Sequence, residues 1–201
     1  LIKIGIESGR LTHNHPTGFL GAMVAAVFTA FAMQQIPPKK WGRMMLDDFI
    51  PKARAYLEET ERDWENNRNN MHHLVGKFEE YLKVRGISDG ESDPVFPEKY
   101  GVAERDAFYR RWSFSGWAGA SGDDSCIVAY DALLGAKDSW EEVVKRGVLH
   151  YGDSDSTGIL CCAWFGALYG MKGVPHVNYE NLEYGQRLLY LADRLYEKSE
   201  W

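Results

Sequence analysis

The chain has 201 residues, of which 45% are hydrophobic, a formal charge of −6 and three cysteines. This composition is typical of one globular domain, and without a Lys/Arg-rich stripe it gives no basis for nucleic-acid binding. An odd number of cysteines, with Cys161 and Cys162 adjacent in an apolar stretch, does not form a disulfide framework and favours a cytoplasmic protein.

The predicted elements are all helical, because no two alternating segments are joined by a hairpin turn. The chain opens on apolar residues, which we interpret as a start inside a fold. Residues 19–34 are apolar on nearly every side and predict a buried central helix, for which we expect a partner surface outside the 201 residues. Because the apolar stretch 19–33 is shorter than the ~18 residues of a membrane span, we expect no membrane association.

Further along the chain, Pro51 is expected either to kink a helix or to open a second one. Gly86 ends the next helix, and SDGESDP at 88–94 predicts a surface loop. Ser139 and Glu142 form a capping-box pattern at a helix start. The helices expected after residue 34 are 41–60, 61–84, 103–111, 123–134, 139–150, 153–170 and 178–198.

The motif GDSDSTG at 152–158 places two carboxylates and three hydroxyls immediately before an apolar helix. Oxygen ligands of this kind suit a hard cation. A helix cap would need only one of the two carboxylates, and the second repels the first unless a cation or hydrogen bonds compensate. The motif therefore predicts a metal site, with an elaborate helix cap as the alternative.

Two other families use a similar motif. An EF-hand loop beginning at Asp153 would need a glutamate at the position of Trp164, which excludes it. Phosphatases of the haloacid dehalogenase type use Asp-x-Asp-x-Thr, which Asp153, Asp155 and Thr157 match. In those enzymes the motif follows a parallel strand, whereas residues 148–151 predict the end of a helix.

Two further segments are candidates for ligand binding. The turn SGRLTHNHPTG at 8–18 precedes a helix start, where free N–H groups can bind an anion, or its polar groups satisfy one another. Its two histidines lack a third ligand at the spacing of a zinc site. The Gly/Ser loop 113–122 lets a ligand approach the backbone, with Phe114 or Trp117 stacking on a base, or is a flexible surface loop.

Together these segments resemble the ADP-ribosylarginine hydrolases, relatives of the glycohydrolase that reactivates bacterial dinitrogenase reductase. The resemblance covers nearly the whole chain. Its main strings are SGRLTHNHPTGFLGA at 8–22, YLKVRGI at 81–87, DGES at 89–92, FSGWAGASG at 114–122, AYDALL at 129–134, GDSDSTG at 152–158, ALYGMKGV at 167–174 and NYENLEY at 178–184.

The resemblance implies an all-α fold, a compact orthogonal helical domain of which residues 1–201 are the C-terminal part. It implies two Mg²⁺ ions, with ligands from Asp153, Asp155 and Ser156. It also implies that ADP-ribose is bound by residues of the turn and the loop, namely His13, Phe114, Ser115, Gly116, Gly119 and Ser121.

The implied reaction is hydrolysis of the N-glycosidic bond between ADP-ribose and arginine side chains of modified proteins. Such a reaction needs a carboxylate that activates water or protonates the leaving group. The family places it in a Thr-Asp-Asp-Thr segment of an N-terminal half, and no such string occurs here. We therefore expect the catalytic carboxylate, and the rest of the fold, to come from that half, either in the native full-length chain or in another polypeptide.

Two departures from the family pattern bear on activity. Tyr151 stands where the family commonly has glycine, so bulk is expected beside the metal site. Asp123 stands where the arginine hydrolases tend to have histidine, and a carboxylate near a diphosphate is unfavourable unless it points away. These departures leave a catalytically inactive ADP-ribose-binding or structural relative as the alternative.

Overall fold

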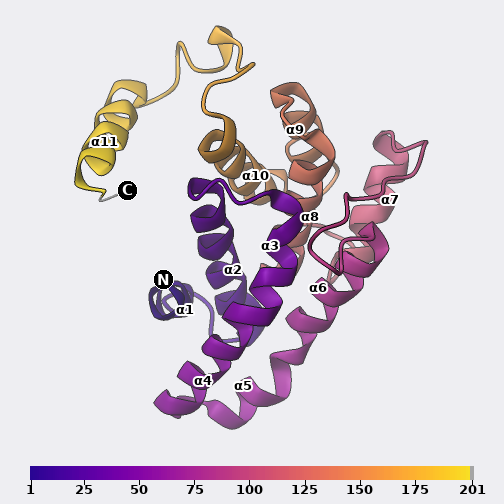
Figure 1. The fold of residues 1–201 in the computed structure, drawn as a ribbon, viewed down its shortest axis with the longest axis vertical. Helices are drawn as coiled ribbons and strands as arrows, with labels where there is room; N and C mark the ends of the chain where they lie inside the picture. The colour runs from indigo at the N-terminus through magenta and orange to yellow at the C-terminus, as the bar shows by residue number, and fades with distance from the viewer. Residues whose placement is uncertain (200–201) are drawn as a thin grey trace.

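The fold was analysed in a computed structural model, which describes residues 1–199 and contains no strand in that range (Figure 1). The all-α prediction is confirmed, and the three cysteines are free. The elements are α1 (Ile2–Arg10), α2 (Pro16–Met33), α3 (Pro38–Met44), η1 (Met45–Phe49), α4 (Ile50–Thr60), α5 (Trp64–Asn70), α6 (His72–Arg85), α7 (Val102–Trp112), α8 (Gly122–Ala136), α9 (Trp140–Gly147), α10 (Ser154–Tyr169), η2 (His176–Asn178) and α11 (Gly185–Lys198).

Helix α2 is the central helix, as its composition predicts, and packs on α1, α8 and α10. Phe19, Met23 and Phe28 are among its fully buried side chains. The chain's own helices cover much of α2, but Thr29 and Met33 are exposed, so the expected partner surface outside the 201 residues stays a prediction. With its 18 residues, α2 is long and apolar enough for a membrane span. However, 56% of these residues are buried, and buried core helices can have the same length and apolar character.

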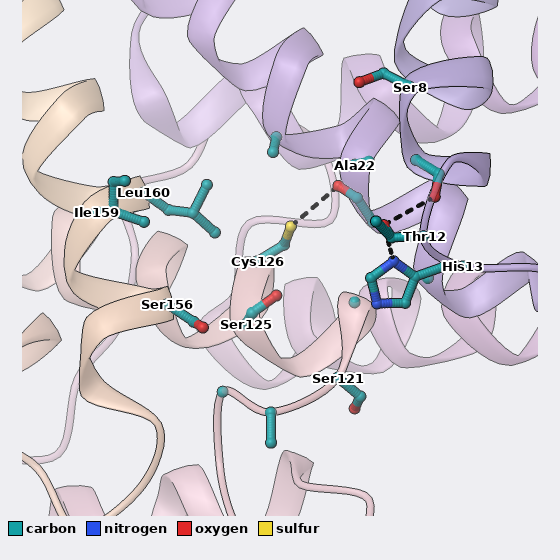
Figure 2. A pocket seen from close by; sticks show the side chains of 17 residues that line it. Ser8, Thr12, His13, Ala22, Ser121, Ser125, Cys126, Ser156, Ile159 and Leu160 are labelled. Atoms are coloured by element: carbon teal, nitrogen blue, oxygen red, sulfur yellow. Dashed lines mark hydrogen bonds between the residues drawn. The ribbon is translucent and has the colours of Figure 1, made fainter.

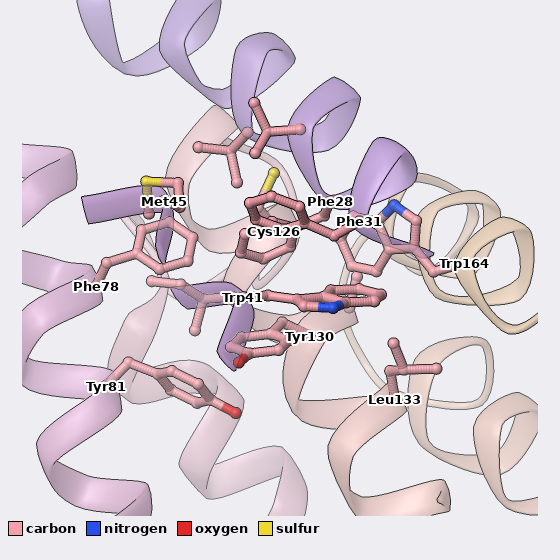
Figure 3. Close-up of a cluster of buried hydrophobic side chains, with 14 of the residues drawn as sticks. Phe28, Phe31, Trp41, Met45, Phe78, Tyr81, Cys126, Tyr130, Leu133 and Trp164 are labelled. Atoms are coloured by element: carbon pink, nitrogen blue, oxygen red, sulfur yellow. The ribbon is translucent and has the colours of Figure 1, made fainter. Parts of the chain in front are cut away.

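An aromatic cluster joins α2, α3, α8 and α10 (Figure 3). The rings of Trp41 and Tyr130 are stacked, with centroids 6.1 Å apart, and Phe28 lies 5.4 Å from Trp41 and 5.0 Å from Tyr130. The polar atoms of these rings are paired: Trp41 Nε1 donates to Ile36 O, and Tyr130 OH donates to Pro38 O. The cluster thus fixes α2 against the helices that surround the candidate site.

A buried ion pair links α6 to α8. Arg85 Nε donates to Asp131 Oδ1 at 2.6 Å, and both side chains are almost fully buried. The hydroxyls of Tyr81 and Tyr100 also donate to the Asp131 carboxylate, each at 2.9 Å. Because every oxygen of the carboxylate is paired, the buried charge is compensated, and Asp131 serves the fold rather than the candidate site.

Several helix boundaries differ from the sequence predictions. Pro51 is the second residue of α4 after a π-helical turn, so it opens a helix, and Gly86, with φ of +70°, ends α6 as predicted. Helix α1 was not predicted, and the predicted helix over 61–84 is interrupted at Met71. Helix α9 ends at Gly147 rather than residue 150, and α11 begins at Gly185 rather than 178, since η2 and a positive-φ Tyr184 intervene.

Candidate functional site

A cavity of about 420 Å³ lies between α1, α2, α8 and α10 (Figure 2). We call it the first cavity. Its walls combine the three segments that the sequence singled out: His13 from the turn, Gly119 and Ser121 from the Gly/Ser loop, and Ser156 from the GDSDSTG motif. In Figure 2, Ser156 projects from α10 on one side and His13 lies on the opposite side.

A second cavity of about 690 Å³ adjoins the first. Its lining includes Phe114 and Asp123, together with His72 and His73 of α6. Because the two cavities have part of their walls in common, they form a neighbouring pair that an elongated ligand could span. The common residues are Thr12, His13, Gly18, Ala120, Ser121 and Gly122.

Close backbone crossings bring the three segments together. A Cβ atom on Gly21 would lie 2.2 Å from Gly122 O, and one on Gly122 would lie 2.2 Å from Thr17 O. A Cβ atom on Gly152 would lie 2.1 Å from Ala118 O. No side chain fits at such distances, so glycine at these three positions is what allows the turn, the loop and the GDSDSTG motif to meet.

The Gly/Ser loop is held at both ends by one buried carboxylate. Asp124 Oδ1 accepts the backbone N–H of Ser121 at 2.8 Å, and Oδ2 accepts that of Phe114 at 3.3 Å. Burial, with a smaller effect of neighbouring Asp123, raises the pKa of the Asp124 carboxyl. The spacing of Ser121 and Asp124 is that of a capping box, so the sequence held a signal for this anchor that was missed.

Asp123 lines the second cavity, but its charge is compensated. Its Oδ2 lies 2.7 Å from Lys77 Nζ and 3.4 Å from His73 Nε2, and its Oδ1 accepts the hydroxyl of Ser121 at 2.9 Å. Burial alone would raise the pKa of this carboxyl, but the hydrogen bond and charge of Lys77, with Ser121, outweigh burial and lower it. An anion in the cleft therefore faces an ion pair rather than a free carboxylate.

The GDSDSTG motif turns sharply into α10. Asp153 occupies the cap position without a side-chain capping bond, and its N–H donates to Ala118 O at 2.8 Å. Ser156 Oγ donates to Asp153 Oδ2 at 3.1 Å. A hydrogen bond with Asp155, together with burial, raises the pKa of the Asp153 carboxyl, and the same bond lowers that of Asp155.

These oxygens fit part of the ligand set of a hard cation. Two neighbouring carboxyls that shift each other's pKa in opposite directions, with a hydroxyl beside them, are a combination that a cation would stabilise. Among residues 1–199, no group of three or more His, Cys, Asp or Glu side chains is placed to hold a metal ion. A cation held by Asp153, Asp155 and Ser156 would need further ligands.

The remaining predicted residues contribute less to the two cavities. Phe114 lines the second cavity but is 81% exposed, and Ser115 and Gly116 form the exposed tip of the loop without lining either cavity. Gly116 has φ of +81° and open space around it. Tyr151 lines neither cavity, because its ring packs under the Arg110 guanidinium, 4.6 Å from the ring centroid.

His13 is the histidine of the turn that reaches both cavities. The hydroxyl of Thr12 lies 2.7 Å from its Nδ1 and orients the ring. A Cβ atom on Gly18 would lie 2.6 Å from the Cβ of His13, so this glycine makes room for the side chain. His15 instead caps α2, where its Nδ1 accepts the N–H of Thr17.

Comparison with known proteins places this site in a family. The sequence pattern of the ADP-ribosylglycohydrolase family matches residues 1–201. ADP-ribosylhydrolase ARH1 of Dictyostelium discoideum is 49% identical over 97% of this chain, and a putative ADP-ribosyl glycohydrolase, L444, of Acanthamoeba polyphaga mimivirus is 29% identical over 94%. The chain spans 54% and 38% of the lengths of these two relatives. The chain belongs to the ADP-ribosylglycohydrolase family.

Proposed function

We propose that the protein is a magnesium-dependent ADP-ribosylarginine hydrolase, and that this chain supplies its ADP-ribose cleft and part of its metal site. The observation that carries the proposal is the meeting of His13, Gly119 and Ser156 at one cavity, although they come from three separate segments. Membership of the family and the 49% identity to an ADP-ribosylhydrolase support the reaction class.

The start of α2 is the part of the cleft best suited to a diphosphate. Gly18 lines both cavities, and α2 has no acidic residue in its first turn. The first turn of α8, by contrast, contains Asp123 and Asp124. Since the helix dipole attracts anions, we assign the diphosphate to the start of α2, beside His13. Phe114 is then placed to stack on the adenine.

The GDSDSTG motif, which we call the metal motif, serves the ribose end of the cleft in this proposal. Asp153, Asp155 and Ser156 hold their oxygens at the start of α10, next to Gly119. Mg²⁺ bound there would orient the ribose hydroxyls and stabilise charge as the bond to the guanidino nitrogen breaks. Ile159 lines the first cavity one turn farther along α10.

The catalytic carboxylate is assigned to the part of the full-length protein beyond this chain. Asp124 is fully committed to the backbone of the Gly/Ser loop, and Asp123 to Lys77 and Ser121. Neither is free to activate water at the metal motif. The remaining magnesium ligands are assigned to the same part and to water, because one oxygen from each of the three residues leaves about three positions of an octahedral Mg²⁺ unfilled.

The test is release of ADP-ribose by the purified full-length protein from peptides modified on arginine or on serine. We expect Mg²⁺-dependent release from the arginine-linked peptide and little from the serine-linked one. Binding of ADP-ribose without release would instead identify an inactive binding relative. Absence of both binding and release would identify a structural relative.

A second test compares residues 1–201 alone with the full-length protein in the same assay. We expect the segment alone to release no ADP-ribose, since it lacks a positioned carboxylate and a complete metal site. Full activity of the segment would show that its own carboxylates carry the reaction.

A further inference from the structure

His150 lies between α9 and α10, three residues before Asp153, and both nitrogen atoms of its ring are engaged. The backbone N–H of Gly152 donates to Nδ1 at 3.1 Å, and Nε2 lies 2.7 Å from Thr157 Oγ1. The Thr157 hydroxyl donates in turn to Gly147 O at 2.7 Å. The ring therefore joins the residue before Asp153 to the first turn of α10 and spans the whole metal motif.

These contacts assign the tautomer of His150. A backbone N–H can only donate, so Nδ1 accepts from Gly152 and carries no proton. Because Thr157 donates its hydroxyl proton to Gly147, its oxygen accepts from Nε2, which carries the proton of the neutral ring. Burial lowers the pKa of His150, an effect that Asp106 opposes and Arg105 reinforces. The neutral ring is thereby favoured near neutral pH.

Two residues of helix α7 contact His150 and the backbone beside it. Tyr109 is fully buried, and its ring meets that of His150 edge to face at 5.5 Å. Arg105 donates to Leu149 O at 2.8 Å and so fixes the backbone next to His150. Thr157 is fully buried as well. The imidazole thus contacts α7 through Tyr109 and α10 through Thr157. The adjoining Tyr151 packs against Arg110 instead.

We propose that His150 is a positioning residue, which sets the backbone of the turn so that Asp153, Asp155 and Ser156 present their oxygens together. It touches neither the cleft nor the ligands and acts through Gly152 and Thr157. The inference rests on the proposed function, because the turn is assigned there to Mg²⁺. Residues that orient metal ligands typically change metal affinity by about 10- to 100-fold when they are replaced.

The experiment uses the full-length protein with four substitutions. His150→Phe removes both hydrogen bonds, and His150→Asn keeps an acceptor near the position of Nδ1 for Gly152 N–H. Thr157→Val removes the hydroxyl on the other side with little change of volume. His176→Phe is the matched control, because His176 is exposed in η2 and pairs with Glu180.

Amide hydrogen exchange of residues 150–158 is the first measurement, since it needs neither metal nor substrate. We expect faster exchange in His150→Phe and Thr157→Val, partial rescue in His150→Asn, and wild-type exchange in His176→Phe. ¹⁵N spectra of the wild-type ring should show an unprotonated Nδ1. Unchanged exchange in His150→Phe, or a protonated Nδ1, would overturn the proposal.

Titration with Mg²⁺ alone is the second measurement. We expect affinity about 10- to 100-fold weaker in His150→Phe, with recovery in His150→Asn. Affinity equal to wild type in His150→Phe would overturn the positioning role even if the turn had loosened. If the wild-type protein binds no Mg²⁺, the proposed function fails, and the exchange data still decide whether His150 holds the turn.

Discussion

Replacement of Gly152 by alanine tests the crossing that joins the Gly/Ser loop to the metal motif. The added Cβ would lie 2.1 Å from Ala118 O and 3.0 Å from Ala118 N and C, all of them backbone atoms that no rotamer change can move away. The two backbone segments, at Ala118 and at Gly152, must move apart. The hydrogen bond from Asp153 N–H to Ala118 O at 2.8 Å is then strained or lost.

The expected destabilisation follows from these two effects. Overpacking at a tight contact costs about 1–3 kcal/mol, and a lost backbone hydrogen bond about 0.5–1.5 kcal/mol. The free energy of unfolding should therefore fall by about 2–4 kcal/mol in Gly152→Ala, and the affinity for ADP-ribose should fall with it. Urea denaturation and calorimetry on the full-length protein measure both quantities.

Gly166→Ala is the matched control, because it makes the same substitution within α10 away from the cleft. A Cβ atom on Gly166 would have no neighbour within 4 Å, so the variant should be more stable by up to about 1 kcal/mol, as expected for alanine in a helix. If Gly152→Ala were as stable as Gly166→Ala and bound ADP-ribose as tightly as wild type, the crossing would not support the site.

Three further predictions follow from the site. Asp155→Asn should weaken Mg²⁺ binding sharply while leaving the melting temperature nearly unchanged, because the carboxylate is exposed; calorimetry showing equal affinity would remove Asp155 from the ligand set. Gly116→Val should lower ADP-ribose affinity, because φ of +81° strains a β-branched residue at the loop tip; equal binding would favour a flexible loop without a role. The lowered pKa of Asp123 means that its pair with Lys77 stabilises the fold above pH ~4, and that this stability is lost as the pH falls through the folded pKa. Lys77→Met should therefore flatten the acid limb of a plot of unfolding free energy against pH. An unchanged acid limb would refute the pairing.

The sequence predicted the fold class and singled out the three segments that line the two cavities. The helical periodicity, the apolar composition of α2 and the capping pattern at Ser139 are local signals, and each corresponds to an observed element, with Ser139 Oγ accepting the N–H of Glu142. The family resemblance rested on short strings that the family pattern also matches. Local chemistry was sufficient for these features because they depend on neighbours along the chain.

The convergence of the segments was not predictable from local patterns. It depends on contacts such as Gly21 with Gly122, which join residues far apart in the sequence. The compensation of Asp123 by Lys77 is also tertiary, since Lys77 comes from α6. The early end of α9 also involves a tertiary contact, because Arg105 of α7 donates to Leu149 O just beyond it.

The central claim is that one ADP-ribose molecule is held by the turn, the Gly/Ser loop and the metal motif at once. A crystal structure of the full-length protein with ADP-ribose and Mg²⁺ tests it most directly. The account predicts the diphosphate at the start of α2 beside His13, the ribose next to Gly119, and Mg²⁺ on Asp153, Asp155 and Ser156. ADP-ribose bound away from the two adjoining cavities, or Mg²⁺ held without these three residues, would contradict it.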